Sequence, residues 1–199
     1  MKDVVFDLGN VLLRWDPRHL YRKVFADEAQ MEDFLETACS MAWIHSIDGC
    51  QDFAEPIKLR ANAYPHYADE LAMFDSRWTE TLDGAIEENV AILRALKAAG
   101  RPVYGITNYP AQKFELSRAL HPFLDAFDEI VVSGREGVTK PDARIYKILF
   151  ERSGRAPEEL VFVDDVPRNI AAAQNLGMAG VLYAPGMNLA AELRNLGAL

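Results

Sequence analysis

The chain is poor in cysteine, with only Cys39 and Cys50 among its 199 residues. Two cysteines cannot build a disulfide framework, and neither stands in a Cys-x-x-Cys pair or at a metal-ligand spacing from a histidine. We therefore expect both to be reduced thiols that pack against the rest of the protein.

Basic residues and long apolar runs are also scarce. The 21 Lys and Arg residues are outnumbered by 30 Asp and Glu residues, which gives a formal net charge of -9. No cluster of Lys and Arg residues offsets this excess of negative charge, so the sequence predicts no nucleic-acid partner. No apolar run approaches the roughly 20 residues needed to span a bilayer, and Asp7 interrupts the opening apolar segment. We expect no membrane partner and a cytoplasmic location.

Core-forming residues are plentiful, since half of the chain is hydrophobic. After Gly84, short apolar runs alternate with segments of helical periodicity. The expected strands lie at 4–6, 102–107, 130–132, 160–163 and 180–182, and the expected helices at 86–99, 111–120, from Pro141 and at 167–176. Such alternation indicates βαβ units, so we predict an α/β fold with a doubly wound parallel sheet.

One segment breaks this alternation. Residues 15–81 contain few strand signals, and their apolar residues recur at helical spacing, as in Leu20, Val24 and Phe25 after Pro17. We predict a small inserted α-helical domain there, with residues 1–14 and 82–199 forming the sheet domain. Trp43 and Trp78 are expected to pack in a core.

Polar residues follow the expected strands. In chain order they are Asp7, Thr107, Asn108, Lys140, Asp164 and Asp165. Ligands of open α/β sheets bind at the carboxyl ends of strands, so we expect these side chains to meet. Three adjacent acids repel one another unless a cation lies among them, which predicts a divalent metal with oxygen ligands. A carboxylate, a hydroxyl, an amide and an ammonium group also suit phosphoryl transfer.

These residues belong to four motifs, which stand in the order VVFDLGNVLL, GITN, TKPD and VFVDD. Over essentially its full length the chain resembles the haloacid dehalogenase (HAD) superfamily, and it is most similar to the phosphatase-like subfamily I with a helical cap of the C1 type. The resemblance implies a Rossmann-like core and Mg²⁺ as cofactor. It also implies hydrolysis of a small phosphorylated metabolite, such as a sugar phosphate, through an aspartyl-phosphate, by a monomer or a homodimer.

The resemblance also implies a role for each residue. Asp7 would be the nucleophile and a metal ligand, and Lys140 would link it to the phosphoryl group. The phosphate binders would be Thr107 and Asn108, together with Lys140. Further metal-site groups would be the backbone carbonyl of Gly9, the direct ligand Asp165 and the second acid Asp164, with Asn169 supporting them from the next helix.

One position departs from the family pattern. Many of these phosphatases carry an Asp two residues after the nucleophile as general acid and base, and here that residue is Gly9. General acid-base catalysis contributes about 10²- to 10⁴-fold, so the resemblance implies a slower enzyme or a good leaving group. Asp16 or His19 could replace the missing group, whereas His45, His66 and His121 are expected to be surface or packing residues. We expect the loop from Ser40 to Asp52 to face the site.

Other interpretations remain open at this point. Thr107 and Asn108 could cap a helix, Lys140 could be a surface residue, and Arg14 or Arg18 could contact a substrate anion. A metal-independent 2-haloacid dehalogenase would share the nucleophile and the lysine, although the acid pair argues against it. A phospho-acceptor with little turnover would use similar residues, but receiver domains place the acid pair first. A binding protein that has lost catalytic activity would also be consistent with Gly9 at a position where many of these phosphatases carry an Asp.

Overall fold

The main sheet has five parallel strands in the order β5-β4-β1-β6-β7. A computed structural model describes residues 1–199. Its main-sheet strands are β1 (Asp3–Phe6), β4 (Val103–Thr107), β5 (Glu129–Val132), β6 (Leu160–Asp164) and β7 (Ala179–Leu182). Because β1 lies in the middle, the chain adds β4 and β5 on one side of it and β6 and β7 on the other. The predicted doubly wound α/β fold is confirmed.

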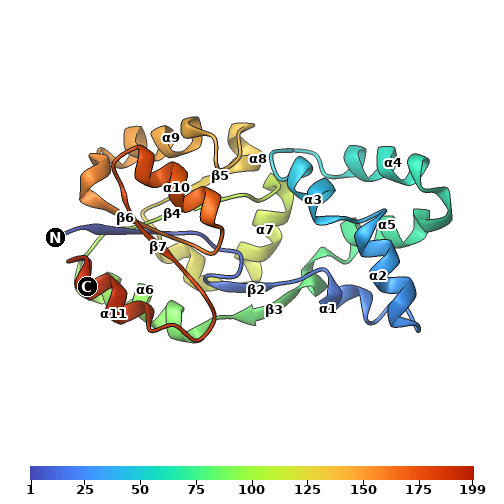
Figure 1. The fold of residues 1–199 in the computed structure, drawn as a ribbon, viewed down its shortest axis with the longest axis horizontal. Helices are drawn as coiled ribbons and strands as arrows, with labels where there is room; N and C mark the ends of the chain where they lie inside the picture. The colour runs from blue at the N-terminus through green and yellow to red at the C-terminus, as the bar shows by residue number, and fades with distance from the viewer.

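Helices cover both faces of this sheet (Figure 1). They are α6 (Glu87–Ala98), α7 (Ala111–Leu120), α8 (Ser133–Glu136), α9 (Ala143–Ser153), α10 (Pro167–Asn175) and α11 (Leu189–Asn195), with the 3-10 turns η3 (Pro122–Ala126) and η4 (Pro157–Glu159). Val5 packs with residues of α9 and α10, whereas Val4 and Phe6 pack with residues of α6 and α11. Burial on both faces explains the continuous apolar runs of the strands.

One helix begins later than the sequence predicted. We expected a helix from Pro141, but α9 starts at Ala143. The side chain of Asp142 accepts a hydrogen bond from the backbone N–H of Arg144, and this cap satisfies an N–H group that the first helical turn leaves without a partner.

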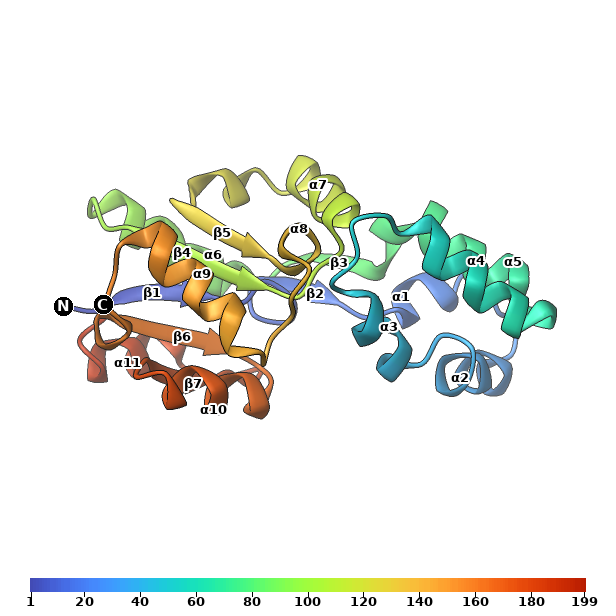
Figure 2. The ribbon, with the colours of Figure 1, turned by 90° about the horizontal axis from the view of Figure 1, so that it is seen from above.

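The helical segment forms a second lobe at one end of the molecule (Figure 2). Its elements are α1 (Arg18–Tyr21), α2 (Glu28–Glu36), α3 (Met41–Ile47), α4 (Ala54–Ala63), η1 (Pro65–Tyr67), α5 (Ala68–Ser76) and η2 (Trp78–Thr81). A two-stranded antiparallel ribbon, β2 (Leu13–Trp15) with β3 (Leu82–Ala85), joins the two lobes. The sequence analysis missed this ribbon, and the predicted boundary after residue 14 falls within β2. We call the two parts the core lobe and the cap lobe.

Aromatic side chains fill the cap lobe. Tyr21 meets Phe34 with ring centroids 4.6 Å apart, and Phe74 meets Trp78 at 5.1 Å. Trp78 is buried, as predicted, and Trp43 is partly buried against the same hydrophobic cluster. That cluster continues into the core lobe, so the two lobes share a hydrophobic interior.

Both cysteines are free thiols, as expected. Burial raises the pKa of Cys39 to about 12 and that of Cys50 to about 11, so both are protonated at neutral pH.

The segment that follows α3 in the cap lobe is held closely against the core lobe. Ser133 donates from its hydroxyl to the carbonyl of Asp48 at 2.6 Å, and the N–H of Ala111 donates to the carbonyl of Cys50 at 3.2 Å. A Cβ atom at Gly134 would lie 2.6 Å from the carbonyl oxygen of Cys50. Only glycine therefore allows the chain to pass this closely, which fixes the end of α3 relative to the sheet.

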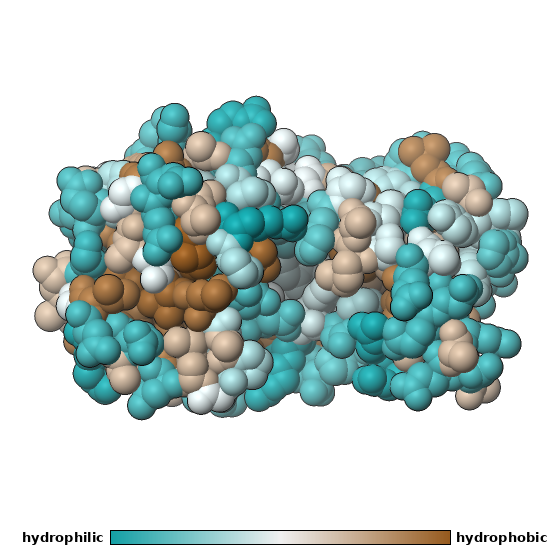
Figure 3. All heavy atoms as spheres, in the orientation of Figure 1, coloured by the Kyte–Doolittle hydropathy of each residue, from teal (hydrophilic) through white to brown (hydrophobic).

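The surface shows the same division into two lobes with a narrower waist between them (Figure 3). Apolar surface gathers on the core lobe, over β7 and the segment leading to α11, where Leu182 is 47% exposed. None of the helices combines the length and the apolar character that a membrane crossing requires.

Candidate active site

Strand register brings the acidic residues together. Phe6 in β1 pairs with Val163 in β6, so the next residues, Asp7 and Asp164, lie beside each other at the carboxyl ends of these strands. The N–H of Asp7 donates to the carbonyl of Val163 at 2.8 Å. Asp7, Asp164 and Asp165 each offer a carboxylate oxygen, and these atoms lie within 4.8 Å of one another.

Lys140 joins two of these acids from the loop between α8 and α9. Its Nζ atom lies 2.9 Å from Oδ1 of Asp7 and 2.7 Å from Oδ2 of Asp164, and it also donates to the carbonyl of Ile106 at 3.0 Å. The lysine is only 3% exposed. Each of the three N–H donors of the ammonium group therefore has an acceptor, which restricts the movement of the Lys140 side chain.

Asn108 holds the backbone of Lys140 in place. Its Nδ2 donates to the carbonyl of Lys140 at 3.1 Å, and its Oδ1 accepts from the N–H of Lys140 at 2.7 Å. Both ends of the amide are therefore engaged with the lysine loop. Thr107, the last residue of β4, is buried and lines the same cavity as Lys140.

The two adjacent acids occupy different environments. Asp164 is fully buried, and its carboxylate accepts from Lys140, from Nδ2 of Asn169 at 3.0 and 3.1 Å, and from the N–H of Val166 at 2.8 Å. Asp165 is partly exposed and lines the cavity. Oδ1 of Asn169 is buried without a hydrogen-bond partner. A cation nearby would satisfy this oxygen as well as the acids.

Charge at the site is unbalanced. Burial raises the pKa of Asp7 to about 7 although Lys140 opposes the shift, and the negative charges of Asp164 and Asp165 add to the rise. Burial, followed by the charge of Asp164, also raises the pKa of Asp165. Burial alone would lower the pKa of Lys140, but its two carboxylate partners outweigh burial and raise it. A divalent cation among these acids would remove the repulsion, so the donor set fits Mg²⁺.

The turn after Asp7 leaves space at Gly9. A Cβ atom at this position would find no other atom within 4 Å, so the missing acid has not been replaced by a neighbouring side chain. Asn10 follows with φ of 54°, a left-handed conformation that asparagine tolerates, and its Oδ1 accepts from the N–H of Trp15 at 3.1 Å. This contact links the first motif to the start of the cap lobe.

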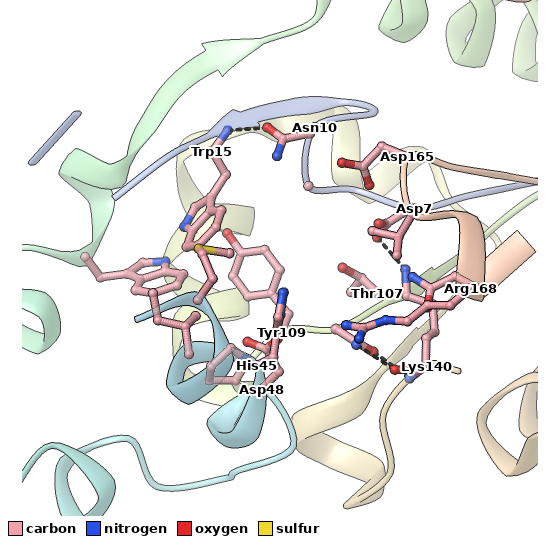
Figure 4. A pocket seen from close by; sticks show the side chains of 18 residues that line it. Asp7, Asn10, Trp15, His45, Asp48, Thr107, Tyr109, Lys140, Asp165 and Arg168 are labelled. Atoms are coloured by element: carbon pink, nitrogen blue, oxygen red, sulfur yellow. Dashed lines mark hydrogen bonds and ion pairs between the residues drawn. The ribbon is translucent and has the colours of Figure 1, made fainter. Parts of the chain in front are cut away.

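These residues line one side of a cavity of about 200 Å³ between the lobes. Figure 4 shows Asp7, Thr107, Asp165 and Arg168 on the core side and Trp15 and His45 on the opposite side. The other cap-side residues that line the cavity are Met41, Ile44, Asp48 and Trp78. The core side is therefore charged, and the cap side is mostly apolar.

Several residues do not lie where the sequence suggested. Arg14 donates to the carbonyl of Ala85, and Arg18 pairs with Glu32. Neither arginine lines the cavity, and neither does Asp16 or His19. These four residues follow the first motif in sequence, but the chain has already turned into the ribbon and α1.

Sequence reasoning missed Arg168 and took His45 for a surface or packing residue. Arg168 lines the cavity from the first turn of α10, shortly after the acid pair, and its place in VFVDDVPR is a signal that could have found it. His45 lines the cavity too, from the segment Ser40 to Asp52, where we expected a loop but where the structure has α3. Its Nδ1 lies 3.3 Å from Oδ2 of Asp48.

Known proteins resemble this chain in sequence and in fold. The model of the haloacid dehalogenase-like hydrolases matches residues 1–177. The chain is 28% identical to the sesquiterpene phosphatase astK of Aspergillus oryzae over 98% of this chain and 96% of that protein. It is 30% identical to flavin mononucleotide hydrolase 1 of Arabidopsis thaliana over 98% of this chain and 77% of that one.

A solved structure has the same fold. A HAD family enzyme of Bacteroides thetaiotaomicron, crystallised as an Asp-to-Ala variant with magnesium and inorganic phosphate, superimposes with a TM-score of 0.72 at 20% identity, over 98% of this chain and 100% of that chain. The sequence motifs, the doubly wound sheet and the family match lead to one conclusion: this chain is a hydrolase and belongs to the haloacid dehalogenase-like family.

Proposed function

We propose that this protein is a Mg²⁺-dependent phosphatase that hydrolyses a small phosphorylated metabolite through an aspartyl-phosphate on Asp7. One observation carries the proposal: Lys140 bridges Asp7 and Asp164 at the floor of a cavity that also exposes Asp165. A nucleophilic carboxylate, a fixed cation beside it and an excess of acid are the groups that phosphoryl transfer onto an aspartate needs.

The metal would be held by Asp7, Asp165 and the carbonyl of Gly9, with Asp164 as the second acid of the site. When bound, Mg²⁺ supplies positive charge that stabilises the phosphoryl group during transfer. Asp164 accepts from both Lys140 and Asn169, so its main task in this proposal is to hold the lysine in position.

Three further residues of the core side would bind the phosphoryl group. The hydroxyl of Thr107 would donate to a non-bridging oxygen, and the ammonium of Lys140 would neutralise charge on another. Arg168 would attract the anion at the cavity. Asn108, which we expected to bind phosphate, is engaged with Lys140 and would act by fixing that residue.

The cap side favours a substrate with an apolar alcohol part. Trp15, Met41, Ile44 and Trp78 line it, and burying apolar surface contributes roughly 25 cal/mol per Å². The similar fungal protein is named a sesquiterpene phosphatase, which indicates an alcohol of this kind. We therefore infer that an apolar or aromatic alcohol phosphate suits this cavity better than the sugar phosphate that the sequence suggested.

The proposal is tested by hydrolysis of p-nitrophenyl phosphate, a terpenoid alcohol phosphate and a panel of sugar phosphates, each with Mg²⁺ and with EDTA. We expect phosphate release that requires Mg²⁺ and is abolished in Asp7→Asn. Asp83→Asn is a matched control, because Asp83 is an exposed acid outside the cavity. No phosphate release under any condition would overturn the proposal. Chloride release from 2-chloropropionate in EDTA would favour the dehalogenase.

A further inference from the structure

The cavity needs a proton donor for the leaving alcohol, and Gly9 cannot supply one. An alkoxide is a poor leaving group, so its departure from phosphorus is slow unless a neighbouring acid protonates it. The space beside Gly9 is open, and no residue of the core side fills it. The donor must therefore come from another residue that lines the cavity.

Most ionisable groups of the cavity are unsuited to this task. Arginine does not release a proton in proteins, which excludes Arg168. Lys140 is held between two carboxylates that raise its pKa. Burial raises the pKa of Tyr109 to about 12, and its hydroxyl is hydrogen bonded to Ser117 at 2.6 Å. Asp7 and Asp165 are assigned to the nucleophile and the metal.

His45 and Asp48 are the remaining groups. The Asp48 side chain is only 9% exposed and its carboxylate faces His45, so a substrate reaches His45 more readily. Imidazole is also the side chain that exchanges protons between about pH 5 and 8. His45 lies on the last turn of α3, and its side chain is 43% exposed, so a substrate can reach it. Figure 4 shows His45 across the cavity from Asp7 and Asp165. That is the side on which the alcohol part of a substrate would lie if its phosphoryl group meets Asp7.

Asp48 orients this imidazole. The aspartate side chain is 9% exposed, and its Oδ2 lies 3.3 Å from Nδ1 of His45. With Nδ1 directed to the carboxylate, Nε2 is available to the substrate. The carbonyl of Asp48 accepts from Ser133 of the core lobe at 2.6 Å. The pair is thus anchored to the sheet domain, although both residues belong to the cap side.

We propose that His45, positioned by Asp48, is the general acid and base that replaces the missing aspartate; this rests on the proposed phosphatase function. As Asp7 attacks phosphorus and the P–O bond to the alcohol breaks, the imidazolium of His45 gives its proton to the departing oxygen. The neutral imidazole then accepts a proton from the water that hydrolyses the aspartyl-phosphate. Phosphate leaves, and the imidazolium is restored.

The proposal is tested with His45→Gln on substrates that differ in their alcohol. The parameter kcat/KM reports steps up to loss of the alcohol, so it isolates the acid role. We expect kcat/KM for an alkyl phosphate to fall by about 10²-fold or more, because general acid catalysis contributes this much. For p-nitrophenyl phosphate, whose leaving group needs no proton, kcat/KM should change less than about threefold, whereas kcat should fall for both substrates if His45 also serves as the base.

One control variant and two further results separate the possible outcomes. His66→Gln changes an exposed cap histidine outside the cavity and should leave both substrates unaffected. Equal losses of kcat/KM for the two substrates in His45→Gln would overturn the role of His45 while leaving the phosphatase intact. Absence of hydrolysis by the unsubstituted enzyme would overturn both proposals.

A pH profile gives an independent readout. Charged groups that line cavities together with His45 are Asp7, Asp48, Lys140, Asp165, Arg168, Asp142 and Arg144. Asp48→Asn should lower kcat/KM for the alkyl phosphate more than for p-nitrophenyl phosphate, because the carboxylate that orients the imidazole is gone. With Asp48 in place, kcat/KM for the alkyl phosphate should fall at alkaline pH, where a general acid has lost its proton. A fall that persists unchanged in His45→Gln would overturn the proposal.

Gly9→Asp offers a rescue. The site has room for the new side chain, and the residue is not in the left-handed region where a side chain would be strained. Combined with His45→Gln, it should restore at least about tenfold of the kcat/KM lost for the alkyl phosphate, because it returns an acid to the position that the family pattern uses.

Discussion

The two sides of the cavity are built differently. On the core side the charged side chains are buried and tied to one another: Lys140 to Asp7 and Asp164, and Asp164 to Asn169. On the cap side the lining is mostly apolar, Met41 is 41% exposed, and the indole N–H of Trp78 is buried without a partner. Strand ends, the loop before α9 and the start of α10 hold the first set, whereas short helices and β2 carry the second.

This difference separates chemistry from recognition. Breaking the Lys140–Asp164 pair on the core side would leave a buried charge without its partner, which costs several kcal/mol. A substitution at Met41 on the cap side mainly changes the shape and polarity of the cavity and costs little stability, whereas Ile44 and Trp78 also belong to the hydrophobic core. The His45–Asp48 pair is the exception, because it brings a titratable group to the apolar side and is hydrogen bonded to the core lobe through Ser133.

The largest effect is expected on the core side, at Lys140. Lys140→Met should abolish turnover and lower the free energy of unfolding by about 3–5 kcal/mol, because Asp164 would stay buried without its cation. Urea unfolding followed by circular dichroism measures the loss. Lys147→Met is the matched control at an exposed lysine of α9. A variant as stable as its control would contradict the idea that Lys140 balances the buried acid.

Gly134→Ala tests how firmly the cap side is fixed to the core side. The new methyl group would lie 2.6 Å from the carbonyl oxygen of Cys50 and 2.8 Å from that of Tyr109, so backbone must move. We expect a loss of about 3 kcal/mol of stability, at the upper end of overpacking effects. At Gly49 a Cβ atom would meet Thr139 at an ordinary 3.4 Å, so Gly49→Ala should be much milder. Equal thermal stability of the two variants would refute a close approach at Gly134.

Asp7→Asn should stabilise the fold in EDTA above pH 7. Burial raises the pKa of Asp7 from an ordinary value of 3.8 to about 7, so the folded state loses stability as pH rises from about 4 to about 7. Asparagine removes this cost and can still accept a hydrogen bond from Lys140. The gain should be at most about 4 kcal/mol at pH 8, from about 1.4 kcal/mol for each unit by which the pKa is raised, and should vanish near pH 4. Melting temperatures at both pH values measure this gain in stability. If Asp7→Asn were less stable than the unsubstituted protein at pH 8, the idea that an ionised Asp7 destabilises the fold would be wrong.

The smallest effect is expected on the cap side. Met41→Ser should raise KM about tenfold for a terpenoid alcohol phosphate, since an apolar contact of this side chain is worth about 1–2 kcal/mol, and Met41 is 41% exposed, so the fold should tolerate the change. For acetyl phosphate, which does not reach Met41, KM should stay unchanged. Leu59→Ser, at an exposed apolar residue of the cap outside the cavity, is the control. Equal changes for both substrates would argue against an alcohol-binding role for the cap side.

Sequence reasoning succeeded best where residues follow strands. The run 160–163 predicted a buried strand, and the acids after it could lie only at the carboxyl end of a parallel sheet. The ribbon β2–β3 escaped notice, because strands of three and four residues that pair only with each other have no periodicity long enough to detect. The same limit explains Arg14 and Arg18: their place in the chain indicated closeness to Asp7, but the ribbon directs them elsewhere.

By itself, the sequence determined the alternation of strands and helices and the identity of the charged groups at the strand ends, because both depend on local apolar periodicity and on which residue follows each strand. Tertiary structure alone decided which acid is buried against Lys140, that Asn108 holds the lysine loop, and that His45 rather than Asp16 or His19 faces the cavity. The place of His45 depends on how the segment after α3 docks against Ser133 and Gly134, a contact between residues about 85 positions apart that local pattern cannot encode.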